Sequence, residues 1–175
     1  KLKRGSGILP HPSLVESMMK EMAHRPEVSF SAKMRLGLDT SEEWKELTDI
    51  LNSSCLKHLT IHPRIGKQMY KGEVHMDSFS EMTQALHTPI IYNGDISCID
   101  DMEKLASSFP NLHGIMIGRG LLARPTMAQE YLQGREMPEQ ERKDKILAMH
   151  EDMLDYCTRK YKVDSQILLH IHAFW

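Results

Sequence analysis

Short apolar runs alternate with segments of helical periodicity along the first two thirds of the chain. Four of these runs have the length and composition of buried strands, and they lie at residues 28–34, 56–62, 90–92 and 113–117. Their starts are roughly 30 residues apart, which is the length of a βαβ unit. A strand that returns to its sheet through a helix pairs in parallel with the strand before it. The alternation therefore predicts a parallel α/β sheet.

The helices between these strands are expected to begin at residues that satisfy free backbone N–H groups. A first helix follows Pro12, where proline fits the first turn. Thr40 and Glu43 have the spacing of a capping box, which predicts a helix start at Thr40. Asp77 and Asp100 precede the next two apolar helical faces and are expected to cap those helices.

Four βα units are half of an eight-stranded barrel, and about eight strands are needed before side chains can fill a closed barrel. After about residue 125 only helical periodicity remains, and residues 139–161 have the pattern of one long charged helix. We therefore expect an α/β fold with about the last four strands of a (β/α)8 TIM barrel at residues 1–133 and an all-helical segment at residues 134–175. Alternatively, two copies of the half-barrel associate.

The two ends of the chain have a bearing on its completeness. The sequence begins at Lys1 without an initiating Met and stops at Trp175, inside an apolar pattern of helical spacing that includes Phe174. We expect the chain to be a piece of a longer protein.

Composition excludes several classes of protein. A formal net charge of −2 argues against a uniformly basic nucleic-acid binder but leaves a local basic patch open. Cys55, Cys98 and Cys157 form no CxxC pair, which favours a cytoplasmic protein over a disulfide scaffold. The histidines show no metal-binding spacing, so no metal is expected. No apolar run is long enough to cross a bilayer, so no membrane association is expected.

Every expected strand ends in a polar or charged group, and barrel active sites lie at the C-terminal ends of the strands. These groups are Lys33 and Arg35, His62 and Arg64, Asn93 with Gly94 and Asp95, and Gly118 with Arg119. Any one of them could be an ordinary loop residue. Their occurrence on all four strands predicts a site at this end of the sheet.

The last two strand ends have the character of an anion site. Backbone N–H groups beside Gly94 and Gly118, together with a helix start, can bind a phosphate, and Arg119 would add a forked, permanently charged donor. Lys33 follows residues that look buried, and a buried ammonium is costly unless it meets an anion. We interpret Lys33 as a cation facing a ligand, with an ion pair to Asp95 as the alternative.

The strand ends resemble four ordered motifs of the tRNA-dihydrouridine synthases. Lys33 to Gly37 resembles K-x-R-x-G; His62, Arg64, Gln68, Tyr70 and Gly72 resemble H-x-R…Q-x-Y-x-G; Asn93 to Ile96 resembles NGDI; and residues 114–125 resemble G-x-M-I-G-R-G…P. The resemblance runs from the first residues through Pro125. It implies an FMN-dependent TIM-barrel enzyme with a C-terminal helical tRNA-binding domain, which reduces uridine in tRNA to 5,6-dihydrouridine with NADPH.

Residue roles follow from the resemblance by position. Cofactor binding would fall to Lys33, His62, Asn93, Gly94, Asp95, Gly118 and Arg119, with the last two at the phosphate. Contact with tRNA would fall to Arg35, Arg64, Lys67, Gln68, Tyr70 and Lys71. The family's acid cysteine belongs upstream of Lys1, so no catalytic residue is expected in this chain.

Two alternative functions stay open. One is another FMN- or phosphate-binding TIM-barrel oxidoreductase that acts on a small molecule. The other is a non-catalytic RNA-binding half-barrel.

Overall fold

The computed structural model describes residues 3–172, which fall into two compact units. The first unit comprises the residues up to Ile96 together with Lys104–Ile117. The second comprises Ser97–Glu103 and the residues from Gly118 onward. The domain boundary expected after residue 133 stays a prediction.

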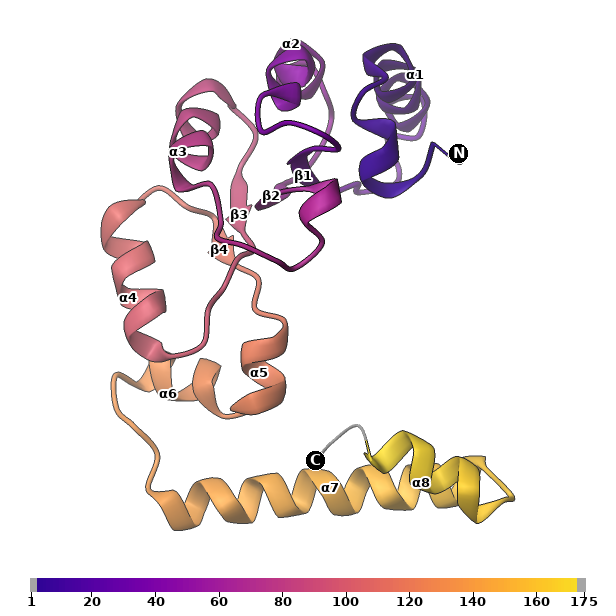
Figure 1. Ribbon diagram of the computed structural model, residues 1–175, viewed down its shortest axis with the longest axis vertical. Coiled ribbons are helices and arrows are strands. Elements are labelled where there is room, and N and C mark those ends of the chain that lie inside the picture. Colours follow the sequence, from indigo (N-terminus) through magenta and orange to yellow (C-terminus); the bar gives the residue numbers. More distant parts are fainter. Residues whose placement is uncertain (1–2, 173–175) are drawn as a thin grey trace. The chain divides into compact units, whose positions relative to one another are not determined.

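The first unit is built on a four-stranded parallel sheet in the order β1-β2-β3-β4 (Figure 1). The strands are β1 at Ala32–Gly37, β2 at Leu59–Ile65, β3 at Ile90–Tyr92 and β4 at Gly114–Ile115. Parallel strands that neighbour one another in chain order, with helices between them, have the arrangement of part of a (β/α)8 barrel. The predicted α/β fold class is confirmed.

Three of the four strands have boundaries that differ from those predicted from the apolar runs. The first strand begins at Ala32 rather than at Val28, whose side chain is 45% exposed. Hydrogen bonding to β2 sets its extent, and the strand reaches the fully buried Leu36. β2 continues past His62 to Ile65, whereas β4 is only two residues long. Partner strands therefore decide these ends more than local hydrophobicity does.

A bulge interrupts the pairing of β1 with β2 next to the predicted site. Arg35 pairs with His62 but Gly37 pairs with Ile65, so β2 has one residue more than β1 in this interval. Pro63 lies in the interval, beyond the part of β2 that pairs with β3, where its missing N–H breaks no bond to β3. Such bulges bend a strand and change the direction of its side chains.

Helices cover the sheet and complete its core. The helical elements of this part of the chain are η1 (Gly5–Ile8), α1 (Pro12–Ala23), η2 (Glu43–Leu47), α2 (Thr48–Asn52), η3 (Gly66–Gln68), α3 (Met76–Ala85) and α4 (Ile99–Ser108). Figure 1 shows α1, α2 and α3 along one side of the sheet. Leu59 and Ile61 of β2 are fully buried, as are Phe79 and Met82 of α3. The Phe79 ring also meets Tyr92 of β3 edge-on, with centroids 5.0 Å apart.

The helix starts differ from the predicted caps. No helix begins at Thr40; instead the Glu43 carboxylate accepts N–H bonds from Leu38, Asp39 and Thr40 ahead of η2. His75, not Asp77, precedes α3, and Asp77 lies in its first turn.

For α4 the expected cap at Asp100 is also wrong. Its neighbour Asp101, in the first turn of α4, instead accepts hydrogen bonds from the backbone N–H groups of Ser97 and Cys98, which lie just before the helix.

The second unit contains α5 (Arg119–Ala123), α6 (Met127–Gln133), α7 (Glu139–Lys160) and α8 (Asp164–His172). The predicted long helix is confirmed as α7. Cys157 is the one buried residue of α7, and α7 contacts α8, whose Ile171 is also buried. The Tyr161 ring stacks on His170 at 4.4 Å between centroids. Phe174 and Trp175 lie outside the described residues.

Candidate active site

Three basic side chains that were expected at strand ends lie instead within β1 and β2: Lys33 is the second residue of β1, Arg35 is its fourth, and His62 is the fourth residue of β2. Lys33 and Arg35 alternate along β1 and so point to the same face, and the Cα of Arg35 pairs in register with that of His62. Lys33 is exposed rather than buried, yet its pKa is lowered, first by partial loss of water around the ammonium and then by Arg35. Repulsion between cations this close favours an anionic or acceptor-rich ligand at the surface.

His62 is buried and neutral at physiological pH. Burial first, then the charges of Arg35, Lys33 and Arg64, lower its pKa to about 4, while Asp95 opposes the shift. Its Nε2 lies 3.3 Å from Nη1 of Arg64. A guanidinium can only donate, so this contact is a hydrogen bond only when Nε2 is the unprotonated nitrogen of the ring.

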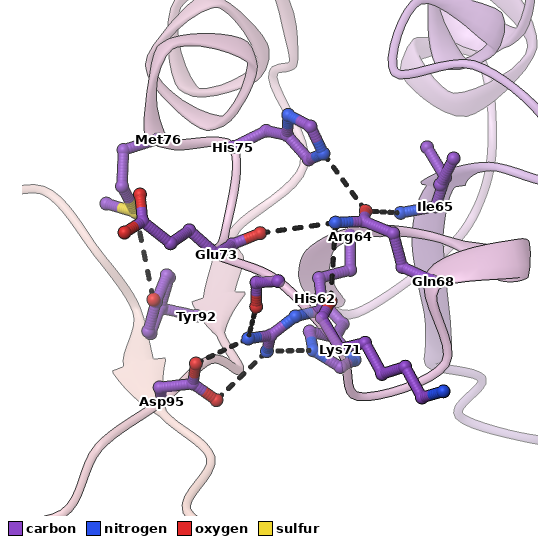
Figure 2. Close-up of polar contacts among 11 residues, drawn as sticks. His62, Arg64, Ile65, Gln68, Lys71, Glu73, His75, Met76, Tyr92 and Asp95 are labelled. Carbon is purple, nitrogen blue, oxygen red and sulfur yellow. Dashed lines mark hydrogen bonds and ion pairs between the residues drawn. The ribbon is translucent and has the colours of Figure 1, made fainter.

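Arg64 is 2% exposed and is held from two neighbouring loops (Figure 2). Its Nη1 donates to Oδ1 of Asp95 at 2.9 Å, and its Nη2 donates to Oδ2 at 2.5 Å. Nη2 also donates to the carbonyl oxygen of Gly72 at 2.6 Å. This bidentate pair raises the pKa of Arg64, chiefly through the hydrogen bonds to Asp95.

The loop after β2 is closed around the side chain of Gln68. Its Oε1 accepts the N–H of Ile65 at 2.8 Å and lies 3.0 Å from Nε2 of His75, as Figure 2 shows. Its Nε2 donates to the carbonyl of Glu73 at 3.3 Å. The left-handed φ of +68° at Gly72 turns the chain so that the Gly72 carbonyl meets Arg64. Gln68 therefore holds the loop internally.

The exposed Tyr70 lies beside the half-buried Arg35. The Tyr70 ring is 62% exposed and lies 5.7 Å from the Arg35 guanidinium, measured to the ring centroid. Its centroid is 6.2 Å from that of His62. Arg35 is fixed by a 2.7 Å bond from Nη1 to the carbonyl of Ile65. A ring fixed beside cations can stack on a planar ligand.

The remaining predicted lysines of this loop lie on its outer surface. Lys67 pairs with Asp39 at 2.5 Å, with both side chains about half exposed or more. Lys71 is exposed. Exposed cations of this kind can contact a polyanion in solvent.

Asn93 joins the ends of three strands. Its backbone N–H donates to the carbonyl of Ile61 at 2.8 Å, and its side-chain Nδ2 donates to that of Met116 at 2.8 Å. Gly94 follows, and a Cβ there would lie 2.0 Å from the hydroxyl of Tyr92. The Asn-Gly-Asp segment is therefore tightly packed, and Asp95 extends from it to Arg64.

The structure brings most of the predicted site residues together in the first unit. They are Lys33, Arg35, His62, Arg64, Gln68, Tyr70, Asn93, Gly94 and Asp95. Gly118 and Arg119 belong to the second unit, where they open the five-residue helix α5. Sequence reasoning missed His75 and the Gly72 carbonyl as partners of the site. The only local signal was the glycine itself, at a position that needs positive φ.

Other kinds of site have little support in the described part of the chain. Within residues 3–172 no three His, Cys, Asp or Glu side chains are grouped as metal ligands. No described helix is long and apolar enough to cross a membrane. Cys55, Cys98 and Cys157 are all free thiols.

Comparison with known proteins gives a consistent result. A sequence model of the family described as Dihydrouridine synthase (Dus) matches residues 1–174. A tRNA-dihydrouridine synthase B from Vibrio parahaemolyticus is 30% identical over 164 residues, covering 87% of this chain and 51% of that protein. The corresponding protein of Vibrio vulnificus is 32% identical over 140 residues, covering 77% and 43%.

A relative whose name gives a position in the tRNA is also similar. The tRNA-dihydrouridine(16) synthase of Pseudomonas putida is 27% identical over 138 residues, covering 78% of this chain and 42% of that protein. The chain spans about half the length of the curated relatives it matches.

Proposed function

The chain belongs to the dihydrouridine synthase family, and we propose that it is part of an FMN-dependent enzyme that reduces uridine in tRNA to 5,6-dihydrouridine with NADPH. The match over residues 1–174 confirms the family resemblance predicted from the motifs. The observation that carries the function is the cluster of Lys33, Arg35 and neutral His62 on the paired strands β1 and β2.

The donors of this cluster fit the chemistry of a flavin. Lys33 and Arg35 contribute positive charge, and the Nδ1–H of His62 contributes a neutral donor. A flavin ring is rich in acceptors and becomes anionic when reduced, so preorganised donors and cations stabilise it. When bound, FMN would supply the hydride for the C5–C6 bond of the uracil.

The other residues would position the substrate and the ends of the cofactor. The exposed Tyr70 ring is suited to stack on a base that has left the tRNA helix, and Lys67 and Lys71 to meet phosphates. Asn93, Gly94 and Asp95 would border the ribityl-phosphate end, with Gly118 and Arg119 at the phosphate. The acid that protonates the second carbon and completes the reduction would lie in the part of the relatives that this chain does not cover.

Flavin binding tests the site directly. FMN is titrated into the purified chain and quenching of flavin fluorescence is followed. Lys33→Gln is expected to weaken binding at least about tenfold, because about 1.4 kcal/mol of charge–acceptor interaction is lost. Lys57→Gln, which changes an exposed lysine just before β2, is the matched control and should leave the affinity unchanged. Equal affinities for the two variants would remove Lys33 from the flavin site.

The reaction is tested in cells. Deleting the gene that encodes this chain should abolish dihydrouridine at one or more tRNA positions, mapped by reverse transcription after chemical treatment. An unchanged map, with flavin binding intact, would favour a flavoenzyme that acts on a small molecule. An unchanged map without flavin binding would favour the RNA-binding half-barrel.

A further inference from the structure

We propose that Arg64 and Asp95 form a positioning pair for His62, in which Arg64 holds the imidazole as the Nδ1–H tautomer so that it presents a neutral donor to the ligand. The proposal assigns Arg64 to the interior of the site rather than to the surface that meets tRNA. It rests on the proposed function only for the identity of the ligand, since the tautomer is a property of the chain itself.

The hydrogen bonds of Arg64 use every terminal N–H that the side chain has. The two hydrogens on Nη1 have acceptors in Asp95 Oδ1 at 2.9 Å and His62 Nε2 at 3.3 Å. The two on Nη2 have acceptors in Asp95 Oδ2 at 2.5 Å and the Gly72 carbonyl at 2.6 Å. The guanidinium is thereby fixed in one orientation and has no terminal donor left for a phosphate or a base.

The fifth donor of Arg64, its Nε–H, cannot contact a ligand either. Its Nε is buried and has no hydrogen-bond partner among the described residues, so it does not face solvent. A buried guanidinium is costly unless its charge is compensated, and the bidentate Asp95 carboxylate supplies the compensation. The carboxylate itself is about half exposed, so it reaches inward from the end of β3 to a cation that solvent does not reach.

Three separate segments meet at this guanidinium. Arg64 itself lies on β2 beside the bulge, Asp95 follows β3, and Gly72 closes the loop after β2. His62 is two residues before Arg64 on the same strand, and Nη1 of Arg64 lies 3.3 Å from its Nε2. Arg64 is held by Asp95 and Gly72 and in turn contacts one ring nitrogen of His62, so it can fix the orientation of that ring.

The hydrogen bond from Arg64 to Nε2 determines whether Nδ1 of His62 is a donor or an acceptor. A neutral imidazole has one donor and one acceptor nitrogen, and the bond made by one nitrogen sets the role of the other. Because Arg64 occupies Nε2 as a donor, Nδ1 must carry the proton. The charged groups that act on the ring are Arg35, Lys33, Arg64 and Asp95; three of the four are cations, and they oppose its protonation.

The cations of the cluster and its neutral donor therefore have different roles. Lys33 and Arg35 are the cations at the surface, and His62 is a neutral donor throughout the physiological range. A neutral donor can bond a carbonyl oxygen of a ring without adding a further charge. On the proposed function this acceptor belongs to the flavin or to the uracil.

Long-range ¹H–¹⁵N NMR of the ¹⁵N-histidine-labelled chain, without flavin, tests the tautomer. The His62 signals are assigned by their loss in His62→Gln. In the wild-type chain we expect Nδ1 to be protonated and Nε2 unprotonated from pH 6 to pH 8. Arg64→Gln, and separately Asp95→Asn, should convert this pattern to a mixture of tautomers, because the donor to Nε2 is lost or released.

Two further variants separate charge from geometry. Arg64→Lys keeps the positive charge, but its three donors on one nitrogen cannot replace the four bonds that two guanidinium nitrogens make to Asp95, Gly72 and His62, so the tautomer should still be lost. Asp39→Asn removes an exposed carboxylate that pairs with Lys67 and should leave the His62 pattern unchanged.

The results that would overturn the proposal are specific. Protonated Nε2 in the wild-type chain would refute it, and so would an unchanged pattern in folded Asp95→Asn and Arg64→Lys. Arg64→Lys keeps a positive charge beside Asp95, so that variant retains the test if Arg64→Gln does not fold. Failure to bind FMN would contradict the proposed function and leave the tautomer result standing.

Discussion

At the residue scale, His62 couples the stability of the fold to pH. Its pKa is about 4 in the folded chain, below its ordinary 6.5, so the unfolded chain binds more protons between these values. The stability that a neutral His62 contributes is present above about pH 6.5 and is lost as the pH falls toward 4. We expect a loss of at most about 2 kcal/mol between pH 7 and pH 5, since solvent near the ring screens part of the interaction.

Urea denaturation at the two pH values measures this loss. His62→Gln should remove that part of the pH dependence, whereas His87→Gln changes an exposed histidine and should preserve it. The same pH dependence in wild-type and His62→Gln chains would show that other groups are responsible.

Gly94 is closely packed, so a side chain added there should destabilise the fold. A Cβ at Gly94 would lie 2.0 Å from the Tyr92 hydroxyl, and Tyr92 is packed against Phe79 in the core. Gly94→Ala must therefore displace a buried ring, and we expect it to destabilise the fold by about 1 to 3 kcal/mol. Thermal unfolding measures the cost. At Gly114 the nearest atom to a new Cβ is 3.9 Å away, so Gly114→Ala is the matched control and should unfold near the wild-type temperature.

At the element scale, a buried carboxylate holds α6 to the segment that leads into α7. Glu130 is fully buried, and its oxygens accept bonds from Arg124, Thr126 and the N–H of Met137. These bonds, Arg124 first, lower the pKa of Glu130 to about 2. The stabilisation is therefore present above pH 4.5 and is lost as the pH falls toward 2.

Removing this carboxylate should loosen the helical segment. We expect Glu130→Ala to cost about 3 to 5 kcal/mol, because Arg124 and the Met137 N–H lose a buried acceptor. Glu136→Ala is a suitable control, since Glu136 also bonds Arg124 but is 75% exposed. Hydrogen exchange of α6 and α7 amides reports the effect, and equal exchange in the two variants would contradict it.

The elements also show what the sequence could and could not predict. Strand order and the position of each motif follow from alternation and spacing, which are local properties of the chain. The start of β1 was misplaced because its pairing with β2, and not its own apolar residues, decides where it begins. The expected caps failed where Glu43 and Asp101 reach back to N–H groups before their helices.

The candidate site also contains some features that could be predicted from the sequence and others that could not. That Lys33, Arg35 and His62 are neighbours could be predicted because successive parallel strands lie side by side, although these residues lie within their strands rather than at the ends. The engagement of Arg64 by Asp95 and Gly72 could not, since it depends on how two loops and a bulge meet in space. Residues whose partners are far away in sequence have no local signature.

At the scale of the whole molecule, the sheet has two edges that another strand could join. Within the described residues β1 pairs only with β2, and β4 only with β3. Unpaired backbone groups on parallel strands favour pairing with another chain. We expect the purified chain to associate in a concentration-dependent way, measured by sedimentation velocity.

The helical segment is the competing source of association, because Leu168 and Leu169 of α8 are 66% and 73% exposed. If the sheet edges are responsible, the double variant Leu168→Lys and Leu169→Lys should associate like the wild-type chain. Amides of β1 and β4 should then become protected from hydrogen exchange as concentration rises. Loss of association in the double variant, with edge amides still exchanging, would place the contact on α8. A chain that stays monomeric at every concentration would show that its edges are closed to other strands.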